Sequence, residues 1–212
     1  MGTIKQGVLG GFSGKVGTVI GASWKGTAYM RGQATHVKNP RTEKQIAQRT
    51  KMEFARNFLQ PAAEFINLGF RDVAKHQSPF NYAASQMMRD AIYGDYPDYS
   101  PVYSKLKWSH GLLTPPVVET VYANYDALDF LWQDNSWQGN AKADDISMVV
   151  VCSEEKQEIK CFMNGYTRSA NSTHCELPES WVDDHVHVYI TMRSADGKLI
   201  SNSHYCGEFL LE

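Results

Sequence analysis

The strongest candidate for metal chemistry is a short segment rich in acid and histidine. In Asp183-Asp184-His185-Val186-His187 the two histidines are separated by a single residue. Alternate residues of a β-strand project from the same face, so both imidazoles would lie on one face of a strand. Two neutral imidazoles and a carboxylate could hold a divalent cation. No further ligands follow at the spacing of a known zinc site, so we favour a solvated strand face and expect no metal or other cofactor.

The pair Gly14-Lys15 suggests a phosphate-binding loop of the kind that holds nucleotides. Such a loop needs a glycine five positions before the Gly-Lys pair, where Leu9 stands, and Ser or Thr directly after it, where Val16 stands. Because both positions differ, the motif fails. The sequence favours a flexible basic ribbon at this place.

Nucleophilic side chains are present but lack the residues that would activate them. Ser13 and Ser23 lie in Gly-x-Ser segments like the front half of a nucleophile elbow, but Lys15 and Lys25 replace the final glycine. The four cysteines are Cys152, Cys161, Cys175 and Cys206, with no C-x-x-C pair among them. We expect the first two to lie opposite each other across a hairpin as small buried side chains. No catalytic residues are predicted, and we expect a protein that is not an enzyme.

Length and composition indicate an ordered globular protein. The chain has 212 residues, of which 42% are hydrophobic and 12% aromatic, enough apolar side chain to bury a core. The longest unbroken apolar run, Met148–Cys152, is far shorter than the roughly 18 residues of a membrane-spanning helix. The N-terminal residues lack the apolar stretch of a signal peptide. We therefore expect a cytoplasmic protein, or part of a particle released by lysis, that does not enter a membrane.

The net charge of −2 conceals an uneven distribution of charge along the chain. Residues 1–60 contain ten Lys/Arg and two Asp/Glu, a balance of +8, whereas residues 61–212 have a balance of −10. The cations of the first segment are Lys5, Lys15, Lys25, Arg31, Lys38, Arg41, Lys44, Arg49, Lys51 and Arg56. A protein with two surfaces of opposite sign can associate head to tail with its neighbours.

The first 38 residues predict a glycine-rich β-ribbon. Two β-favouring runs, Val16–Trp24 and Thr27–Arg31, are joined by Lys25-Gly26, which suits a two-residue hairpin turn. Glycine within a strand weakens it, so we expect the ribbon to need a partner surface, either the rest of the chain or a neighbouring subunit.

Three helices are predicted after the ribbon. A capping box at Thr42 starts the first helix, and Pro61 ends it and begins the second. Ser78 caps the third helix, whose apolar residues recur at helical spacing, and Gly94 is expected to stop it.

Beyond residue 104 the apolar period changes from helical spacing to alternation, which predicts an antiparallel sandwich of about seven strands. The expected strands are 117–124, 128–133, 148–152, 159–163, 174–177, 185–193 and a last one from 198 onward. With Trp132 on the second strand and a turn at Ser194–Lys198, the segment 116–212 resembles a fibronectin type III or immunoglobulin-like module. Such a module with a tyrosine corner has an aromatic residue on the inward face of its sixth strand. This chain departs from that pattern, because alternation directs Val188 inward and Tyr189 outward.

A second resemblance covers nearly the whole chain. It is carried by Gly10-Gly11-Phe12-Ser13-Gly14-Lys15-Val16-Gly17, Trp24-Lys25-Gly26, Arg31-Gly32, Asn39-Pro40-Arg41-Thr42, Tyr96-Pro97-Asp98-Tyr99 and Ser194-Ala195-Asp196-Gly197-Lys198. With these motifs the chain resembles an uncharacterised domain-of-unknown-function family of Bacteroidetes. The resemblance implies a shared fold, but it supplies no activity and no catalytic residues.

Together these features predict an α+β protein in which a β-ribbon and three-helix region, residues 1–103, precedes an all-β immunoglobulin/fibronectin-like sandwich, residues 104–212. We expect a structural protein that docks to copies of itself or to other protein subunits, as in a phage-like or mobile-element assembly, without a small-molecule substrate. The alternative is nucleic-acid binding by the basic N-terminal region, although no nucleic-acid-binding motif accompanies it. The candidate contact residues are Phe12, Lys15, Trp24, Lys25, Tyr29 and Arg31.

Overall fold

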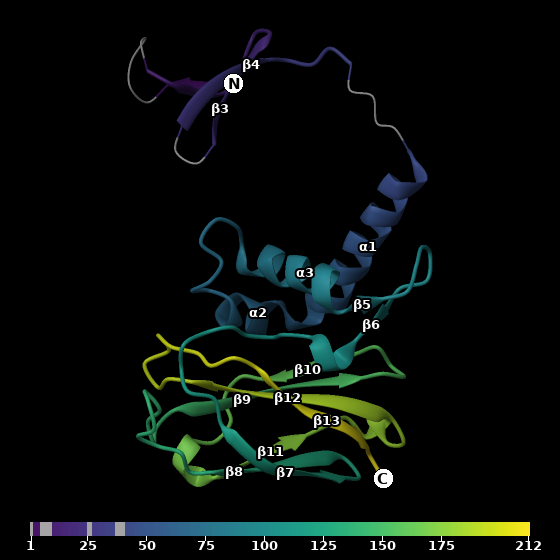
Figure 1. Ribbon diagram of the computed structural model, residues 1–212, viewed down its shortest axis with the longest axis vertical. Coiled ribbons are helices and arrows are strands. Elements are labelled where there is room, and N and C mark those ends of the chain that lie inside the picture. The colour runs from purple at the N-terminus through teal and green to yellow at the C-terminus, as the bar shows by residue number, and fades with distance from the viewer. Residues whose placement is uncertain (1, 5–9, 25–26, 37–40) are drawn as a thin grey trace. The chain divides into compact units, whose positions relative to one another are not determined.

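The computed structural model describes residues 2–4, 10–24, 27–36 and 41–212, and the chain divides into two compact units. Unit 1 is Met1–Thr42 and unit 2 is Glu43–Glu212. The predicted Lys25-Gly26 turn, and with it Lys25 as a candidate contact residue, lies outside the described residues. The elements of both units are drawn in Figure 1.

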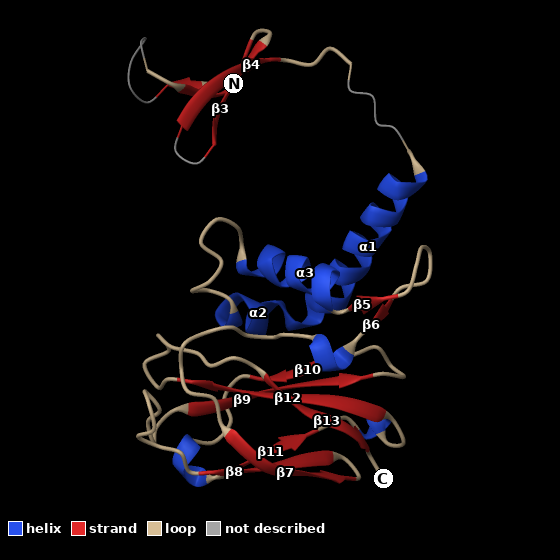
Figure 2. Ribbon diagram, viewed as in Figure 1, coloured by secondary structure: helices blue, strands red, loops and turns tan. Residues whose placement is uncertain are grey.

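Unit 1 contains one antiparallel sheet, which we call the N-terminal sheet (Figure 2). Its strands are β1 (Thr3–Ile4), β2 (Phe12–Val16), β3 (Val19–Trp24) and β4 (Thr27–Gly32), in the spatial order β1-β2-β3-β4. Among the residues of this unit whose burial is described, only Gly21 is buried. The sheet therefore forms without a core of its own, as the glycine-rich sequence led us to expect.

Unit 2 begins with the three predicted helices. They are α1 (Glu43–Leu59), α2 (Ala63–Gly69) and α3 (Pro79–Asp90), with a 3-10 turn at Gln60–Ala62 between the first two. The first helix starts directly after Thr42, and the turn that follows it contains Pro61. The hydroxyl of Ser78 accepts a hydrogen bond from the backbone N–H of Asn81 at 3.2 Å, which confirms Ser78 as the cap of α3.

Gly94 does not end the third helix, contrary to the prediction. The helix stops at Asp90, and the two residues Ile92–Tyr93 form β5, which pairs with β6 (Ser100–Pro101). Gly94 follows β5 with φ +95°, and a Cβ there would collide with the carbonyl oxygen of Asp98. Glycine is needed at this position to shape the loop between β5 and β6.

The second half of unit 2 is a two-sheet sandwich. Its strands are β7 (Val117–Asn124), β8 (Ala127–Gln133), β9 (Ile146–Ser153), β10 (Ile159–Phe162), β11 (Ser172–Glu176), β12 (His185–Arg193) and β13 (His204–Leu210). We call the sheet β10-β9-β12-β13 the central sheet and the sheet β11-β8-β7 the outer sheet. The last strand begins at His204 and not at Lys198, because the intervening Ile200 and Ser201 form only isolated bridges with other segments.

The central sheet is covered on both faces. One face packs against the helices in a core that contains Phe65, Met148 and Tyr189, and the other packs against the outer sheet in a core that contains Phe130 and Val188 (Figure 1). The predicted opposite orientations of Val188 and Tyr189 are confirmed. Tyr189 is nevertheless buried, because the helices cover the face from which it projects.

The shared core explains why the helices and the sandwich lie in one compact unit, Glu43–Glu212. The helices bury their apolar faces against the central sheet, so they belong to the same compact unit as the sandwich. The predicted mixed α+β class is confirmed, with an antiparallel N-terminal sheet, a helical region and antiparallel sheets in the second half. In the described part of the chain, no helix combines the length and apolar character needed to cross a membrane.

Candidate functional site

The strand register of the N-terminal sheet brings four of the predicted contact residues to one face. Lys15 lies opposite Ile20, which lies opposite Arg31 on the next strand. Residues directly opposite each other in antiparallel strands project from the same face, and so do residues two positions apart. Trp24 and Tyr29 therefore share this face with Lys15 and Arg31. We call it the basic–aromatic face, and its members are Lys15, Ile20, Ala22, Trp24, Thr27, Tyr29 and Arg31.

The basic–aromatic face is open to solvent. The side chains of Trp24 and Tyr29 are 70% and 45% exposed, and Lys15 and Arg31 are also exposed. Every residue of β4 is exposed. The face therefore presents two aromatic rings beside two cations, a combination of groups that can take part in both apolar and charged contacts.

Phe12 lies on the other face of the sheet. Its side chain is half-buried, and a Cβ on Gly21 would collide with both the ring and the carbonyl oxygen of Phe12. A Cβ on Gly11 would lie 3.0 Å from the Cβ of Ala28, and a small hollow of about 270 Å³ is lined by residues that include Phe12, Ala28 and Tyr29. The ring of Phe12 thus packs on Gly21, on the face of the sheet opposite Lys15 and Arg31.

The charged side chains of unit 1 are all positive. Residues 1–42 hold six of the 21 Lys/Arg residues and none of the 23 Asp/Glu residues. Lys15 and Gly14 belong to β2, where they pair with Ile20 and Gly21, so the Gly-Lys pair lies in a strand and not in a phosphate-binding loop. The sheet therefore offers cations without a neighbouring carboxylate of the same unit to neutralise them.

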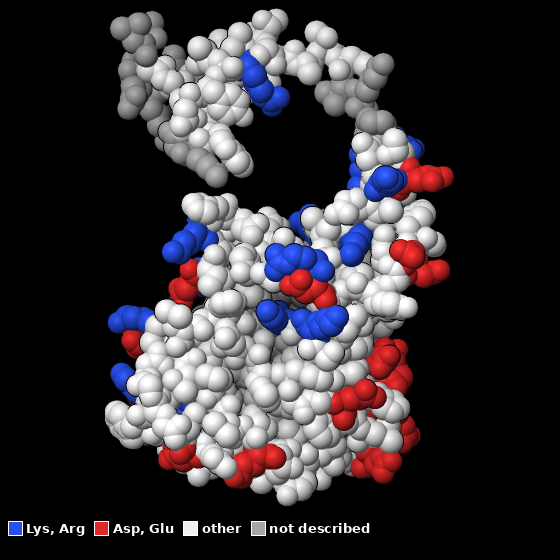
Figure 3. All heavy atoms as spheres, viewed as in Figure 1, with Lys and Arg blue, Asp and Glu red and all other residues white. Residues whose placement is uncertain are grey.

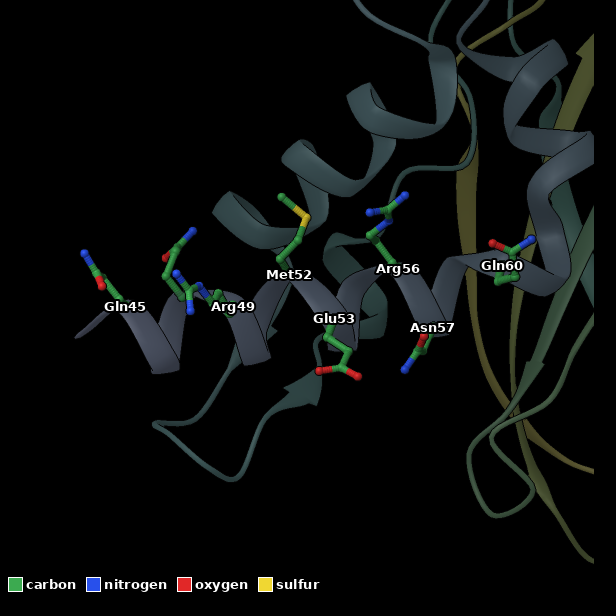
Figure 4. Close-up of a pocket in the computed structure, with 8 residues that line it drawn as sticks. Gln45, Arg49, Met52, Glu53, Arg56, Asn57 and Gln60 are labelled. Carbon is green, nitrogen blue, oxygen red and sulfur yellow. The ribbon is translucent and has the colours of Figure 1, made fainter. Parts of the chain in front are cut away.

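The cations of the first helix belong to a different compact unit from those of the sheet, because α1 is part of unit 2. One side of α1, together with Gln60 of the following turn, carries Gln45, Gln48, Arg49, Met52, Glu53, Arg56 and Asn57. Figure 4 shows most of these side chains along the length of the helix. This side is mixed, since Glu53 lies among its two arginines, and Lys51 lies with the half-buried residues of the opposite side. The ten cations of residues 1–60 do not form one continuous basic surface within a single unit.

The surface of unit 2 carries both signs of charge. In the view of Figure 3, Lys and Arg side chains gather over the helical layer, and Asp and Glu side chains predominate along one flank of the sandwich. All 23 Asp/Glu residues of the chain lie in this unit. The unit therefore provides acidic surface that unit 1 lacks.

The two histidines of β12 occupy separate environments. His185 is exposed, and its Nδ1 lies 2.8 Å from a carboxylate oxygen of Glu155; this hydrogen bond raises the pKa of His185. His187 is buried and stacks on Tyr103 with ring centroids 3.8 Å apart, while its Nδ1 lies 3.0 Å from the hydroxyl of Tyr205. Within the described residues, no group of three or more His, Cys, Asp or Glu side chains is placed to hold a metal ion. The arrangement fits structural contacts for both imidazoles.

The predicted cysteine pair is offset by two residues. Cys152 pairs with Ile159 and Cys161 with Val150, so the two thiols are diagonal neighbours and not directly opposite. Burial raises the pKa of Cys152 well above its usual range, and burial raises the pKa of Cys161 to about 12. Burial also raises the pKa of Cys175 and of Cys206 to about 12. These thiols stay protonated near neutral pH, so none is an activated nucleophile.

A buried ion pair inside the sandwich was not predicted from any motif in the sequence. Arg168 and Asp145 are fully buried, with Nε and Oδ2 3.1 Å apart. Arg168 also donates to the side chain of Asn135 and to the carbonyl oxygen of Thr114 at 2.8 Å, and its own carbonyl accepts from the indole N–H of Trp132. Each nitrogen of the guanidinium thus donates to an oxygen of the protein, so the pair joins loops of the sandwich.

The chain belongs to a family described as "Family of unknown function (DUF6266)", whose model matches residues 11–207. The match begins one residue before β2 and ends within β13, so it includes most of the N-terminal sheet as well as the helices and the sandwich. No curated protein matches the chain.

Proposed function

We propose that this member of the DUF6266 family is a non-enzymatic assembly protein whose N-terminal sheet docks onto an acidic surface of a second copy of the chain. One observation carries the proposal. Lys15, Trp24, Tyr29 and Arg31 come together on a single exposed face of a sheet that has almost no buried residue.

The lack of a core in unit 1 supports docking. A small sheet normally needs an apolar face packed on another element to be stable, and the N-terminal sheet buries only Gly21 among its described residues. Covering apolar surface contributes roughly 25 cal/mol per Å², and a Trp or Tyr side chain offers on the order of 150–250 Å². Contact through Trp24 and Tyr29 would therefore stabilise both the sheet and the assembly.

The distribution of charge supports an acidic acceptor. Two copies of unit 1 repel each other, because residues 1–42 carry six Lys/Arg and no Asp/Glu. Unit 2 carries every carboxylate side chain of the chain, so the attraction is between unit 1 of one copy and unit 2 of another. A contact between two different surfaces is heterologous, and repetition of it generates a ring or a filament.

We also propose that the sandwich is an immunoglobulin/fibronectin-like module that serves as the rigid body of the subunit. Its first, second and fifth strands form one sheet, and its third, fourth, sixth and seventh strands form the other. Six of the seven strands are thus divided between the sheets as in a constant-type immunoglobulin module, in which the fourth strand would join the first sheet. The fold by itself does not define a function, so the docking proposal depends on the N-terminal sheet.

The experiment measures the molar mass of the full-length protein by light scattering after size-exclusion chromatography, at low and at high salt. We expect oligomers at low salt that dissociate as salt rises, because exposed charges are screened. The variant Lys15→Glu/Arg31→Glu should be monomeric at concentrations where the natural protein assembles. The matched control Lys75→Glu/Lys107→Glu changes the net charge equally at exposed positions of unit 2 and should assemble normally.

A full-length protein that is monomeric at low salt overturns the proposal. Nucleic acid is the competing partner, since cations beside aromatic rings can bind phosphates and stack on bases. Retardation of generic single-stranded DNA or RNA by a monomeric protein, lost in Lys15→Glu/Arg31→Glu, would assign the basic–aromatic face to nucleic acid instead.

A further inference from the structure

We infer that the acceptor for the basic–aromatic face is the exposed face of the outer sheet on a second copy of the chain. This inference rests on the proposed function and adds the surface that completes the contact. The members of this outer-sheet face are Val117, Glu119, Thr120, Tyr122, Asn124, Asp129, Leu131, Gln133, Ser172, His174 and Glu176.

The outer sheet is covered on one side only. Its inward residues Leu128, Phe130 and Trp132 are buried in the core that it shares with the central sheet. Figure 1 shows the outer sheet as the last layer of unit 2 on the side away from the helices. On its exposed face, Val117 and Tyr122 are 45% and 55% exposed, so this layer presents apolar side chains to solvent.

The charge on this face is opposite to that of the basic–aromatic face. The three strands of the outer sheet contain no Lys or Arg, and they carry Glu119, Asp129 and Glu176 as exposed carboxylates. The strands β2, β3 and β4 contain Lys15 and Arg31 and no acidic residue. Each of the two faces also presents exposed aromatic side chain. The two faces are therefore opposite in charge and alike in offering apolar surface to a contact.

Neighbouring side chains hold the carboxylates of the outer-sheet face in place. The Asp129 carboxylate accepts a hydrogen bond from the side-chain amide of Asn124 at 2.9 Å, and it lies 2.6 Å from Nδ1 of His174. Glu119 accepts from the side-chain amide of Gln133 at 3.0 Å. A carboxylate fixed before binding loses less conformational freedom when a cation reaches it, which favours a specific contact.

The geometry of two sheet faces suits this contact. Antiparallel sheets pack face to face at about 10 Å, with the side chains of the two faces interdigitating. Tyr122, Asp129 and His174 form one row across the three strands of the outer sheet. Lys15, Ile20 and Arg31 form a similar row across the N-terminal sheet, so cations and carboxylates can alternate with apolar side chains in the contact.

Other surfaces of unit 2 fit the role less well. The exposed side of α1 carries two arginines around Glu53, so it would repel a basic partner. A groove of about 570 Å³ beside Leu112 is bordered by Lys75 and Lys198. The end of the sandwich near β12 already contains a cation, since Nζ of Lys156 lies 3.7 Å from the carboxylate of the buried Asp184.

The test uses two full-length variants and their mixture. The donor variant is Lys15→Glu/Arg31→Glu, and the acceptor variant is Glu119→Lys/Glu176→Lys, whose exposed positions leave the Asp129 contacts intact. We expect each variant alone to associate at least about tenfold more weakly than the natural protein, because like charges then face each other. An equimolar mixture should assemble again, since the two reversed surfaces fit each other. The control Glu64→Lys/Asp95→Lys makes the same change of charge elsewhere and should assemble normally.

The outcomes separate this inference from the proposed function. If the donor variant is monomeric and the acceptor variant assembles like the natural protein, the acceptor surface lies elsewhere and only this inference fails. If both variants assemble normally, both proposals fail. If neither variant assembles and the mixture does not recover, the pairing of these two faces is overturned. Circular dichroism and thermal unfolding of each variant establish that a loss of assembly is not a loss of fold.

A carbodiimide cross-link supplies a direct readout. Lys15 should become linked to Glu119 or Glu176, and in a mixture of ¹⁴N- and ¹⁵N-labelled protein the linked peptides should carry both labels. Links that carry only one label throughout would mean that the contact forms within one chain, which overturns the inference.

Discussion

The N-terminal sheet and the central sheet are both antiparallel, yet they lie at opposite extremes of burial. In the central sheet, β9 and β12 have apolar residues on both faces and are buried along almost their whole length. In the N-terminal sheet, β4 is exposed at all six residues. The difference is one of composition: β9 and β12 contain no glycine, whereas each of β2, β3 and β4 contains one. Strands with large side chains on both faces create a core, and strands interrupted by glycine depend on a surface supplied by something else.

The largest expected effect on stability comes from comparing two tryptophans, one buried in the sandwich and one exposed on the N-terminal sheet. Trp132 of β8 is 2% exposed, and its indole N–H donates to the carbonyl of Arg168 at 2.8 Å, whereas Trp24 of β3 is 70% exposed. Trp132→Ala should lower the free energy of unfolding of unit 2 by about 3–5 kcal/mol, because it leaves a cavity and an unpaired carbonyl.

Trp24→Ala serves as the matched variant. It should change the unfolding of unit 2 by less than about 0.5 kcal/mol, as expected of an exposed position. It should instead weaken association about tenfold, because a large aromatic ring leaves the contact. Denaturant unfolding and light scattering on the same samples give both quantities. Similar losses of stability in the two variants would contradict the contrast between the sheets.

A pair of glycines provides the second test, with a smaller effect. A Cβ at Gly21 would collide with Phe12, whereas a Cβ at Gly32 would have no atom within 4 Å. Gly21→Ala should destabilise the N-terminal sheet by about 1–3 kcal/mol, as overpacking of a close contact does. Gly32→Ala should be neutral or slightly stabilising, since alanine is the better strand residue. Amide hydrogen exchange of β2, β3 and β4 measures both effects, and equal protection in the two variants would show that the approach of Phe12 does not hold the sheet together.

Alternation and capping rules predicted much of unit 2. The strand at Val117–Asn124 and the strand at His185–Arg193 were predicted at their observed bounds, and Ser78 was recognised as a helix cap. The double burial of the central sheet was not predicted. The sequence feature that indicates this burial is the unbroken apolar run Met148–Cys152, which is typical of a strand covered on both faces. A run so short does not reveal which element covers the strand.

The candidate site was predictable in part. Given a two-residue turn after Trp24, alternation places Tyr29 and Arg31 on the face of Trp24, because the register of a hairpin follows from its turn. The faces of Phe12 and Lys15 were not predicted, because both residues precede the predicted run Val16–Trp24. Once both belong to β2, their spacing of three residues directs them to opposite faces, as observed. The partner surface could not be derived from the sequence, since it depends on which face of a folded sandwich remains uncovered.

The smallest predicted effect concerns His185, which lies at the margin of the central sheet where burial gives way to exposure. Its hydrogen bond with Glu155 raises the pKa of His185, so the folded state binds the proton more tightly than the unfolded state does. Desolvation acts to raise the pKa of Glu155, but the hydrogen bonds that its carboxylate accepts from His185 and from its own backbone N–H, with the attraction of the imidazolium, together lower this pKa. The pair therefore stabilises the fold between the lowered pKa of Glu155 and the raised pKa of His185, and this stability is lost as pH rises through the latter.

The matched variant is His185→Gln, which keeps a polar side chain without a titrating proton. We expect the natural protein to exceed this variant in Tm at about pH 5.5 by a small margin, and the difference to vanish toward about pH 8, where imidazole is neutral. A Tm difference that does not change with pH would show that the contact acts through packing alone.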